Sequence, residues 1–204
     1  MPRAVFLDRD DTLIHCDDVT PDGDLGDPAL VRLLPGVLEG CRRLKHADLL
    51  LIVVSNQGGV ARGRFALADV EATNRRVNEL LGGMIDAFRY CPYHPRGIVP
   101  EFAREHPWRK PQPGMYLDAA AALGIDLRSS WCIGDRVRDC QAGRAAGCRT
   151  VLLPTPAYRK VPDDPARGAS GADTSVDFRA ISFEDAVGLV LGEARVPLAA
   201  RAAS

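Results

Sequence analysis

Residues 4–14 read AVFLDRDDTLI, and this stretch constrains the fold more than any other part of the chain. Its first four residues are apolar, as in a short buried strand, and three carboxylates, Asp8, Asp10 and Asp11, follow at once. Carboxylates this close repel one another, and a bound divalent cation offsets that repulsion. The stretch therefore predicts a strand whose carboxyl end carries a charged site.

Apolar strand patterns recur along the chain and alternate with helical patterns. The run LLLIVV is apolar throughout, which is typical of a strand covered on both faces of a sheet. Alternating strands and helices with short connections predict an α/β fold built on a doubly wound parallel sheet. The predicted strands cover residues 4–7, 49–54, 131–133 and 150–153, and the predicted helices follow Gly36, cover 67–82, 117–123 and 139–146, and follow Ser182.

The charge balance and the cysteines narrow the class of protein. The chain has 204 residues, a net charge of −1 and a pI near 6.4, which favours neither a nucleic-acid binder nor a membrane-surface protein. The longest apolar run is too short to span a bilayer and the N-terminus lacks a signal-peptide pattern, so we expect a cytoplasmic protein, and one that acts as a monomer. The six scattered cysteines are expected to be free thiols.

The length suits a single domain, which we expect to cover residues 1–196, followed by a loose tail over 197–204. Residues 154–176, rich in Pro, Gly, Asp and Ala, are predicted to form a surface loop. Between the first two strands there is room only for one helix and a flap, with a Pro-Asp-Gly turn at 20–24. The interval 59–109 fits one helix, a short strand and a loop, so no cap domain of ordinary size is expected and the site is open.

Polar residues follow three of the predicted strands at their carboxyl ends. In a parallel sheet these ends lie along one edge, which is where ligands bind. The sequence therefore predicts that side chains from distant segments meet at this edge. The residues concerned are Asp8, Asp10, Ser55, Asn56 and Asp135.

The chemistry of these side chains favours phosphoryl transfer. Carboxylate oxygens are the ligands that Mg²⁺ prefers, and a hydroxyl and an amide at Ser55 and Asn56 can donate to phosphate oxygens. Arg109 and Lys110 add positive charge that can hold a phosphate. A carboxylate nucleophile, a metal, a lysine and a hydroxyl together describe phosphoryl transfer through an aspartyl-phosphate.

Four segments carry a resemblance to a known family: DRDDT, VVSNQGGVARG, RKPQPGM and IGDRVRDCQAG. In order and rough spacing they resemble the four motifs of the haloacid dehalogenase superfamily, and more closely those of the subfamily of heptose-1,7-bisphosphate and histidinol-phosphate phosphatases. The resemblance spans residues 4–154. It implies a Rossmann-like haloacid dehalogenase fold, a Mg²⁺ cofactor and a phosphatase that acts on a small phosphate monoester.

The resemblance also implies a role for each matched residue. Asp8 would be the nucleophile and Asp10 the acid and base, while Ser55 and Lys110 would hold the transferring phosphoryl oxygens. An acid two residues after the nucleophile suits ester hydrolysis, because dehalogenation needs no leaving-group proton. Substrate contacts are implied for Arg9, Asn56, Arg109 and Arg136, with solvent an equal alternative for Arg136, and metal contacts for Asp8, Asp10 through its carbonyl, Asp135 and, less directly, Asp139.

One turn position departs from the family's pattern. Asp11 stands where the family usually has Gly. A backbone position that needs a positive φ tolerates Asp better than most residues. We therefore expect Asp11 to be a turn residue, with a substrate or metal role as the alternative.

The zinc loop of heptose-bisphosphate phosphatases is also altered. Cys91 fills the first ligand position, but Tyr93 and Trp108 occupy two others, and His94 lies one residue out of register. With His106, at most three nitrogen or sulfur donors are available, whereas structural zinc takes four. We therefore expect the aromatic rings to pack the loop without zinc.

Three functions stay open at this point. The SNQGGVARGRF segment favours a sugar-phosphate phosphatase of the heptose 1,7-bisphosphate type, and the IGDR segment also resembles histidinol-phosphate phosphatases. The third is a non-catalytic module that binds a phosphorylated ligand on the same scaffold. No matched catalytic position is lost, which argues against it.

Overall fold

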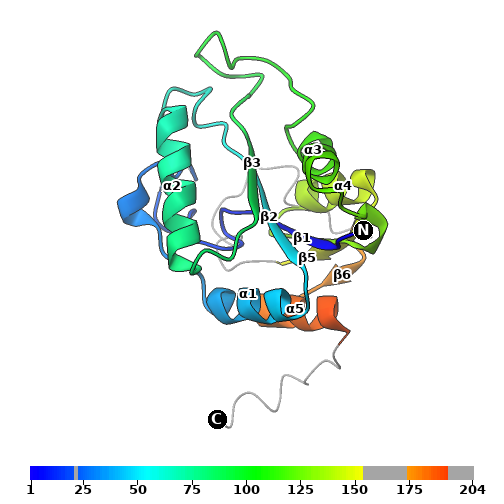
Figure 1. The fold of residues 1–204 in the computed structure, drawn as a ribbon. Coiled ribbons are helices and arrows are strands. Elements are labelled where there is room, and N and C mark those ends of the chain that lie inside the picture. Colours follow the sequence, from blue (N-terminus) through cyan, green and yellow to red (C-terminus); the bar gives the residue numbers. More distant parts are fainter. Residues whose placement is uncertain (21–22, 154–173, 193–204) are drawn as a thin grey trace.

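The computed structural model describes residues 1–20, 23–153 and 174–192, and in them six parallel strands form one sheet (Figure 1). The strand order is β3-β2-β1-β4-β5-β6, which confirms the predicted doubly wound parallel sheet. The strands are β1 (Ala4–Leu7), β2 (Leu50–Asn56), β3 (Ala87–Cys91), β4 (Trp131–Gly134), β5 (Arg149–Leu152) and β6 (Phe178–Arg179).

Helices cover both faces of the sheet, and each face has its own apolar cluster (Figure 1). Val5 and Leu7 of β1 pack in the cluster with α1, α2 and α5, while Ala4 and Phe6 pack with α3 and α4. Successive strand residues face opposite layers, so the whole strand is buried and apolar. The helices are α1 (Val37–His46), α2 (Leu67–Leu80), α3 (Gly114–Leu123), α4 (Val137–Ala146) and α5 (Phe183–Leu191), with the short 3-10 helices η1 (Pro28–Leu30) and η2 (Leu127–Ser129).

Most of the predicted boundaries are confirmed, and the differences have simple causes. α3 and α4 end at the predicted Gly124 and Gly147, and the hydroxyl of Ser182 caps α5 by accepting from the Asp185 amide at 3.1 Å. The strand β6 was not predicted, because two residues are too few to show a period. The tail over 197–204 and most of the loop over 154–176 lie outside the described residues, and the domain boundary at 196 stays a prediction.

The connections leave the carboxyl edge of the sheet open, as predicted. Within the described residues, only η1 and α1 lie between β1 and β2, and only α2 lies between β2 and β3, so no large cap is inserted. Residues 15–20 and 23–34, between β1 and α1, form the described part of the flap, and the centre of the turn predicted at 20–24 lies outside the described residues. None of the described helices has the length and apolar character that crossing a bilayer requires. All six cysteines are buried free thiols, which confirms that prediction.

Candidate active site

Three strand ends deliver polar side chains to the carboxyl edge of the sheet. Asp8 follows β1, Ser55 and Asn56 end β2, and Asp135 follows β4. They border a cavity of about 50 Å³, which limits the buried part of a ligand to a small group. The residues that line it are Asp8, Asp10, Asp11, Asp17, Gly23, Ser55, Asn56, Lys110, Asp135, Arg136 and Arg138.

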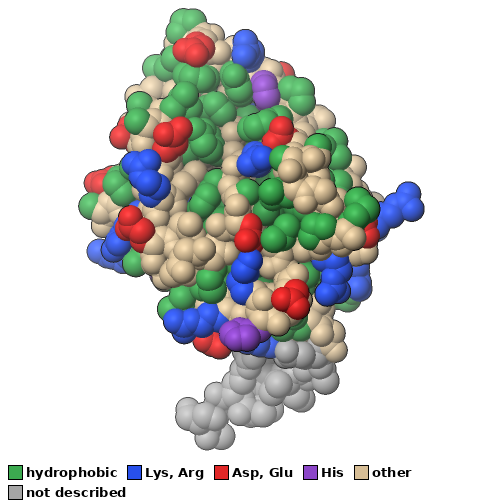
Figure 2. All heavy atoms as spheres, in the orientation of Figure 1, with side chains coloured by type: hydrophobic (Ala, Val, Ile, Leu, Met, Phe, Trp, Pro, Cys, Tyr) green, Lys and Arg blue, Asp and Glu red, His purple; other side chains and the backbone are tan. Residues whose placement is uncertain are grey.

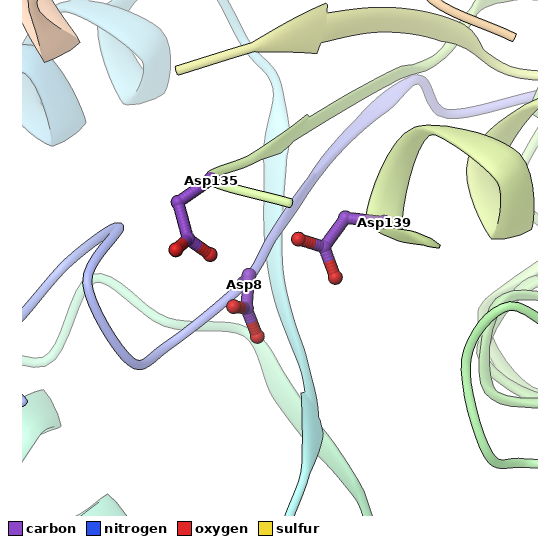
Figure 3. Close-up of side chains that lie close together, drawn as sticks. All are labelled: Asp8, Asp135 and Asp139. Atoms are coloured by element: carbon purple, nitrogen blue, oxygen red, sulfur yellow. The ribbon is translucent and has the colours of Figure 1, made fainter. Parts of the chain in front are cut away.

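Three buried carboxylates, called here the acid trio, face one another in this cavity: Asp8, Asp135 and Asp139 (Figure 3). Each offers an oxygen within 4.8 Å of the other two. Burial, together with the charges of Asp139 and Asp8, raises the pKa of Asp135 well above its ordinary value. Its Oδ1 is buried and accepts no hydrogen bond from a described residue. Mg²⁺ prefers hard oxygen ligands, so three carboxylates that include an oxygen without a hydrogen-bond partner fit this ion.

A glycine at the end of β4 allows the acid trio to form. Asp139 lies in the first turn of α4, and its Oδ2 accepts from the Arg136 amide at 2.9 Å. A Cβ placed on Gly134 would lie 2.4 Å from the Cβ of Asp139. Any larger residue there would push α4 away from the strand end, so the close approach requires glycine.

The ammonium of Lys110 lies among these carboxylates and balances part of their charge. Its Nζ donates to Asp8 Oδ1 at 2.7 Å and to the Val54 carbonyl at 2.9 Å, and lies 2.7 Å from Asp139 Oδ1. Burial alone would lower the pKa of Lys110, but Asp139 and Asp8 outweigh it, so the pKa is raised above its usual value. Lys110 therefore stays charged while it is buried.

Asn56 holds the backbone of Lys110. Its Nδ2 donates to the Lys110 carbonyl at 3.1 Å, and its Oδ1 accepts from the Lys110 amide at 3.0 Å. Both the nitrogen and the oxygen of the Asn56 side-chain amide therefore bind a residue that lies 54 positions further along the chain. Asn56 thus fixes the Lys110 backbone, while its contact with substrate stays a prediction.

Asp10 is held by its neighbours rather than by the acid trio. Its Oδ1 accepts from Arg9 Nε at 2.9 Å, and its Oδ2 accepts from Gln57 Nε2 at 2.7 Å. Arg9 is 0% exposed and also donates to Gln57 Oε1, Asn74 Oδ1 and the Leu25 carbonyl. Arg9 therefore holds the Asp10 carboxylate from a fully buried position, and its contact with substrate stays a prediction.

Gln57 is a functional residue that the sequence reasoning missed. Besides Asp10, its Nε2 donates to Ser55 Oγ at 2.8 Å, and Ser55 Oγ in turn lies 3.4 Å from Asp10 Oδ2. The spacing of two residues from Ser55 could have indicated this role, because side chains two positions apart at a strand end point to the same side. Ser55 and Gln57 are such a pair.

Asp11 and Arg136 connect the site to the flap. Asp11 has a φ of 56°, which confirms the predicted turn, and its Oδ1 accepts from the amides of Cys16 and Asp17 at 3.0 Å each. Burial, followed by repulsion from Asp17, raises the pKa of Asp11 to about 7. Arg136 lines the cavity and forms ion pairs with Asp17 at 2.9 Å and Asp135 at 3.1 Å, and its substrate contact stays a prediction.

Three arginine side chains form a second group near the site, and one of them, Arg138 of α4, lines the cavity. We call Arg62, Arg109 and Arg138 the arginine rim. A Cβ on Gly58 would lie 3.1 Å from Arg62 Nη1 and 3.3 Å from Arg109 Nη1, so these two guanidinium groups approach the same glycine. Burial, followed by the charge of Arg138, lowers the pKa of Arg109 to about 10.

The altered loop is held by stacked rings. Tyr93 stacks on His106 with ring centres 4.1 Å apart, His106 meets Trp108 edge-on at 6.1 Å, and Arg104 lies over Tyr93 at 4.6 Å. The packed arrangement expected for Tyr93 and Trp108 is therefore seen. Among the described residues, the only set of His, Cys, Asp and Glu that gathers as metal ligands would is the acid trio; zinc content itself stays a prediction. Figure 2 shows apolar side chains, interspersed with charged ones, at the end of the molecule that this loop forms.

Known proteins with similar sequences point to one family. A model for HAD-hydrolase-like proteins matches residues 107–174. The D-glycero-beta-D-manno-heptose-1,7-bisphosphate 7-phosphatases of Mesorhizobium japonicum and Escherichia coli are 42% and 39% identical, over 71% and 74% of this chain. The aligned part spans 65% of the first relative's length and 78% of the second's. The chain belongs to the haloacid dehalogenase-like phosphatase family.

A solved structure places this phosphatase family on the same fold. The crystal structure of D,D-heptose 1,7-bisphosphate phosphatase from B. bronchiseptica, complexed with magnesium and phosphate, superposes with a TM-score of 0.77 at 29% identity. The superposition covers 95% of this chain and 100% of that one. The likeness therefore includes the flap and the altered loop region, and it leaves no room in the relative for a large additional cap.

Proposed function

We propose that this phosphatase hydrolyses one phosphate ester of a sugar phosphate, of the heptose 1,7-bisphosphate type, through an aspartyl-phosphate on Asp8. The observation that carries the proposal is the convergence of Asp8, Lys110 and two further buried carboxylates in a cavity that admits only a small group. The names of the relatives at about 40% identity support the substrate class. The magnesium and phosphate in the B. bronchiseptica structure support the cofactor and the anion.

The reaction has two steps that share one acid–base group. In the first, a carboxylate oxygen of Asp8 bonds to phosphorus while the bond from phosphorus to the sugar oxygen breaks, and Asp10 gives that oxygen a proton. In the second, Asp10 takes a proton from water, and the water oxygen bonds to phosphorus while the bond from phosphorus to the Asp8 oxygen breaks. Inorganic phosphate leaves, and the Asp8 carboxylate is restored.

The surrounding residues set the charge and position of these groups. Lys110 and the hydroxyl of Ser55 lie where they can hold phosphoryl oxygens, while Arg9 and Gln57 fix Asp10. Magnesium, when held by the acid trio, supplies positive charge that offsets the carboxylates and the phosphate. The Asp10 carbonyl is a further ligand implied by the family resemblance.

Initial rates against a panel of phosphate esters test the proposal. The panel holds heptose 1,7-bisphosphate, hexose bisphosphates and histidinol phosphate, each measured with Mg²⁺, with a chelator, and with Mg²⁺ restored. We expect the highest kcat/KM on the heptose bisphosphate, loss of turnover with the chelator and recovery with Mg²⁺ alone. Preference for histidinol phosphate would replace the substrate assignment, and full activity after exhaustive chelation would remove the metal from the mechanism.

We also propose that the enzyme works as a cytoplasmic monomer. The six free thiols support a reducing compartment. Sedimentation equilibrium at micromolar concentration should give the mass of one 22.0 kDa chain. A mass of twice that value would show a dimer instead.

A further inference from the structure

The arginines around the cavity differ in whether a carboxylate neutralises them. Arg62 forms an ion pair with Asp24, and its Nε donates to Asp24 Oδ2 at 2.8 Å. Arg136 is paired with Asp17 and Asp135. Within residues 1–20, 23–153 and 174–192, by contrast, no carboxylate lies within ion-pair distance of Arg109 or Arg138.

The guanidinium of Arg138 lies at the cavity wall, and one of its nitrogen donors has no acceptor there. It lines the cavity together with Asp8 and Lys110. Its Nε is buried and donates to no acceptor in the described part of the chain. Arg109 donates from Nη1 to the neutral Tyr93 carbonyl at 3.1 Å, and the charge of Glu105 acts on it only from beyond ion-pair distance.

Arg109 and Arg138 also repel each other. After burial, the charge of Arg138 has the largest influence on the pKa of Arg109, which it lowers. Two like charges that are partly withdrawn from water, without a carboxylate between them, are unfavourable until an anion joins them. Guanidinium groups bind the oxygens of phosphate with paired hydrogen bonds, so a phosphate is the anion that suits this place.

The position of Arg138 on α4 separates the pair of Arg109 and Arg138 from the site that holds the transferring phosphate. Residues in an α-helix turn by about 100° per position, so neighbours on α4 point in different directions. Asp139 points to Lys110, and Arg136, just before the helix, points to the flap. Arg138 lies between them in sequence and lines the cavity, and it is near enough to Arg109 for its charge to lower the pKa of Arg109.

We propose that Arg138, with Arg109, binds the second phosphate of a bisphosphate substrate, the one that is not hydrolysed, and that Arg138 determines the preference for bisphosphates over monophosphates. This inference rests on the proposed function, since it assumes a substrate with one phosphate at Asp8. It gives Arg138 a role beside the substrate contact that was predicted for Arg136, two residues earlier in the chain. Arg136 also contacts the flap through Asp17.

The test compares matched substrates on the full-length enzyme with Mg²⁺. One pair is heptose 1,7-bisphosphate and heptose 7-phosphate, and the other is fructose 1,6-bisphosphate and fructose 6-phosphate. For Arg138→Met we expect kcat/KM on the bisphosphates to fall by about 10–100-fold, mainly through KM, as for the loss of a charge-assisted hydrogen bond. On the monophosphates the change should stay within about twofold, because the transferring phosphate keeps its contacts.

Two further variants separate a specificity role from a structural one. Arg138→Lys keeps the charge and should recover part of the bisphosphate activity. Arg75→Met, on the exposed surface of α2, should leave both substrate classes unchanged. Thermal unfolding of each variant checks that the fold is kept.

The inference and the proposed function fail in different ways. If Arg138→Met lowers kcat/KM equally on both members of each pair, or lowers neither, the role of Arg138 is overturned while the phosphatase assignment stands. If the wild-type enzyme turns over no sugar phosphate, the proposed function is overturned, and this inference with it.

Discussion

The acid trio and the arginine rim both contribute residues to the wall of one cavity, but the two groups are built in different ways. The acid trio is almost completely buried and lies after β1, after β4 and in the first turn of α4; two of its members, Asp8 and Asp139, lie 2.7 Å from the Lys110 ammonium. The arginine rim comes from loops and the first turn of α4, is less buried, and keeps like charges together. Groups attached to the sheet ends keep fixed positions, which bond making requires, whereas groups on loops can differ between relatives that share the chemistry.

The contrast also separates two kinds of electrostatic cost. In the acid trio, repulsion among carboxylates is offset inside the protein by Lys110 and, by our proposal, by Mg²⁺. In the arginine rim, Arg109 and Arg138 have no such internal partner among the described residues, so the compensation must arrive with the ligand. Changes in the first region should therefore affect kcat, and changes in the second should affect KM and substrate choice.

The largest effect is expected from Asp8→Asn, which removes the nucleophile. An amide cannot form the acyl phosphate, so kcat should fall by at least about 10⁴-fold while the fold stays intact. Acid-quenched single turnovers with ³²P-labelled substrate measure this directly, because label should remain on the wild-type chain and not on the variant. A variant that keeps a sizeable share of wild-type kcat would show that Asp8 has another role.

Asp10→Asn should be the next most damaging change, and its size should depend on the leaving group. General acid catalysis supplies about 10²–10⁴-fold, so alkyl phosphates should lose that much in kcat/KM. An activated aryl phosphate needs little protonation and should lose less. Equal losses on alkyl and aryl phosphates would argue against Asp10 as the acid.

Gln57→Met should weaken the reaction by about tenfold, the value of one or two hydrogen bonds to a charged group. Gln57 donates to Asp10 and accepts from Arg9, so its loss frees the carboxylate that must meet the leaving oxygen. The loss in kcat/KM should be larger on alkyl than on aryl phosphates, which is the pattern expected for Asp10→Asn. The loss for Gln57→Met should be smaller than for Asp10→Asn on both kinds of substrate. Thr73→Val on α2, which also removes a buried hydrogen bond but one to Gly26 of the flap, serves as the control for stability alone. If the two variants give the same kinetic profile, Gln57 does not act through Asp10.

The smallest effect is expected at the altered loop. Trp108→Ala removes a ring that meets His106 one residue before Arg109, so KM should rise by between about threefold and tenfold. The loop stays anchored by the bonds between Lys110 and Asn56, so the loss in the free energy of unfolding should be smaller than the loss in binding. Trp108→Phe should retain most of the affinity. Metal analysis should find no zinc, and one tightly held zinc per chain that is released only on unfolding would contradict the packing argument.

The sequence predicted the sheet and two members of the acid trio because both follow local rules, whereas Asp139 was implied only by the family resemblance, and the local pattern offered Asp10 in its place. A buried parallel strand must be apolar throughout, and its carboxyl end must reach the ligand edge, so Asp8 and Asp135 could be placed from their positions alone. The contacts of Arg9, Asn56 and Arg136 could not be read in this way. Each is decided by a partner far away in sequence, such as Lys110 for Asn56 or Asp17 for Arg136. A motif shows that a charged residue is near the site, but only the packing of separate segments shows whether its charge is already neutralised.

The all-parallel sheet has a practical consequence for using this enzyme on a surface. Chain entry into β1 and the acid trio lie at opposite edges of the sheet, separated by four strand residues, or about 13 Å. Residue 1 is 90% exposed at the entry edge. A linker attached there would hold the protein with the cavity turned away from the support. An immobilised form of the catalyst, or a sensor for sugar phosphates, should therefore keep the turnover that it has in solution.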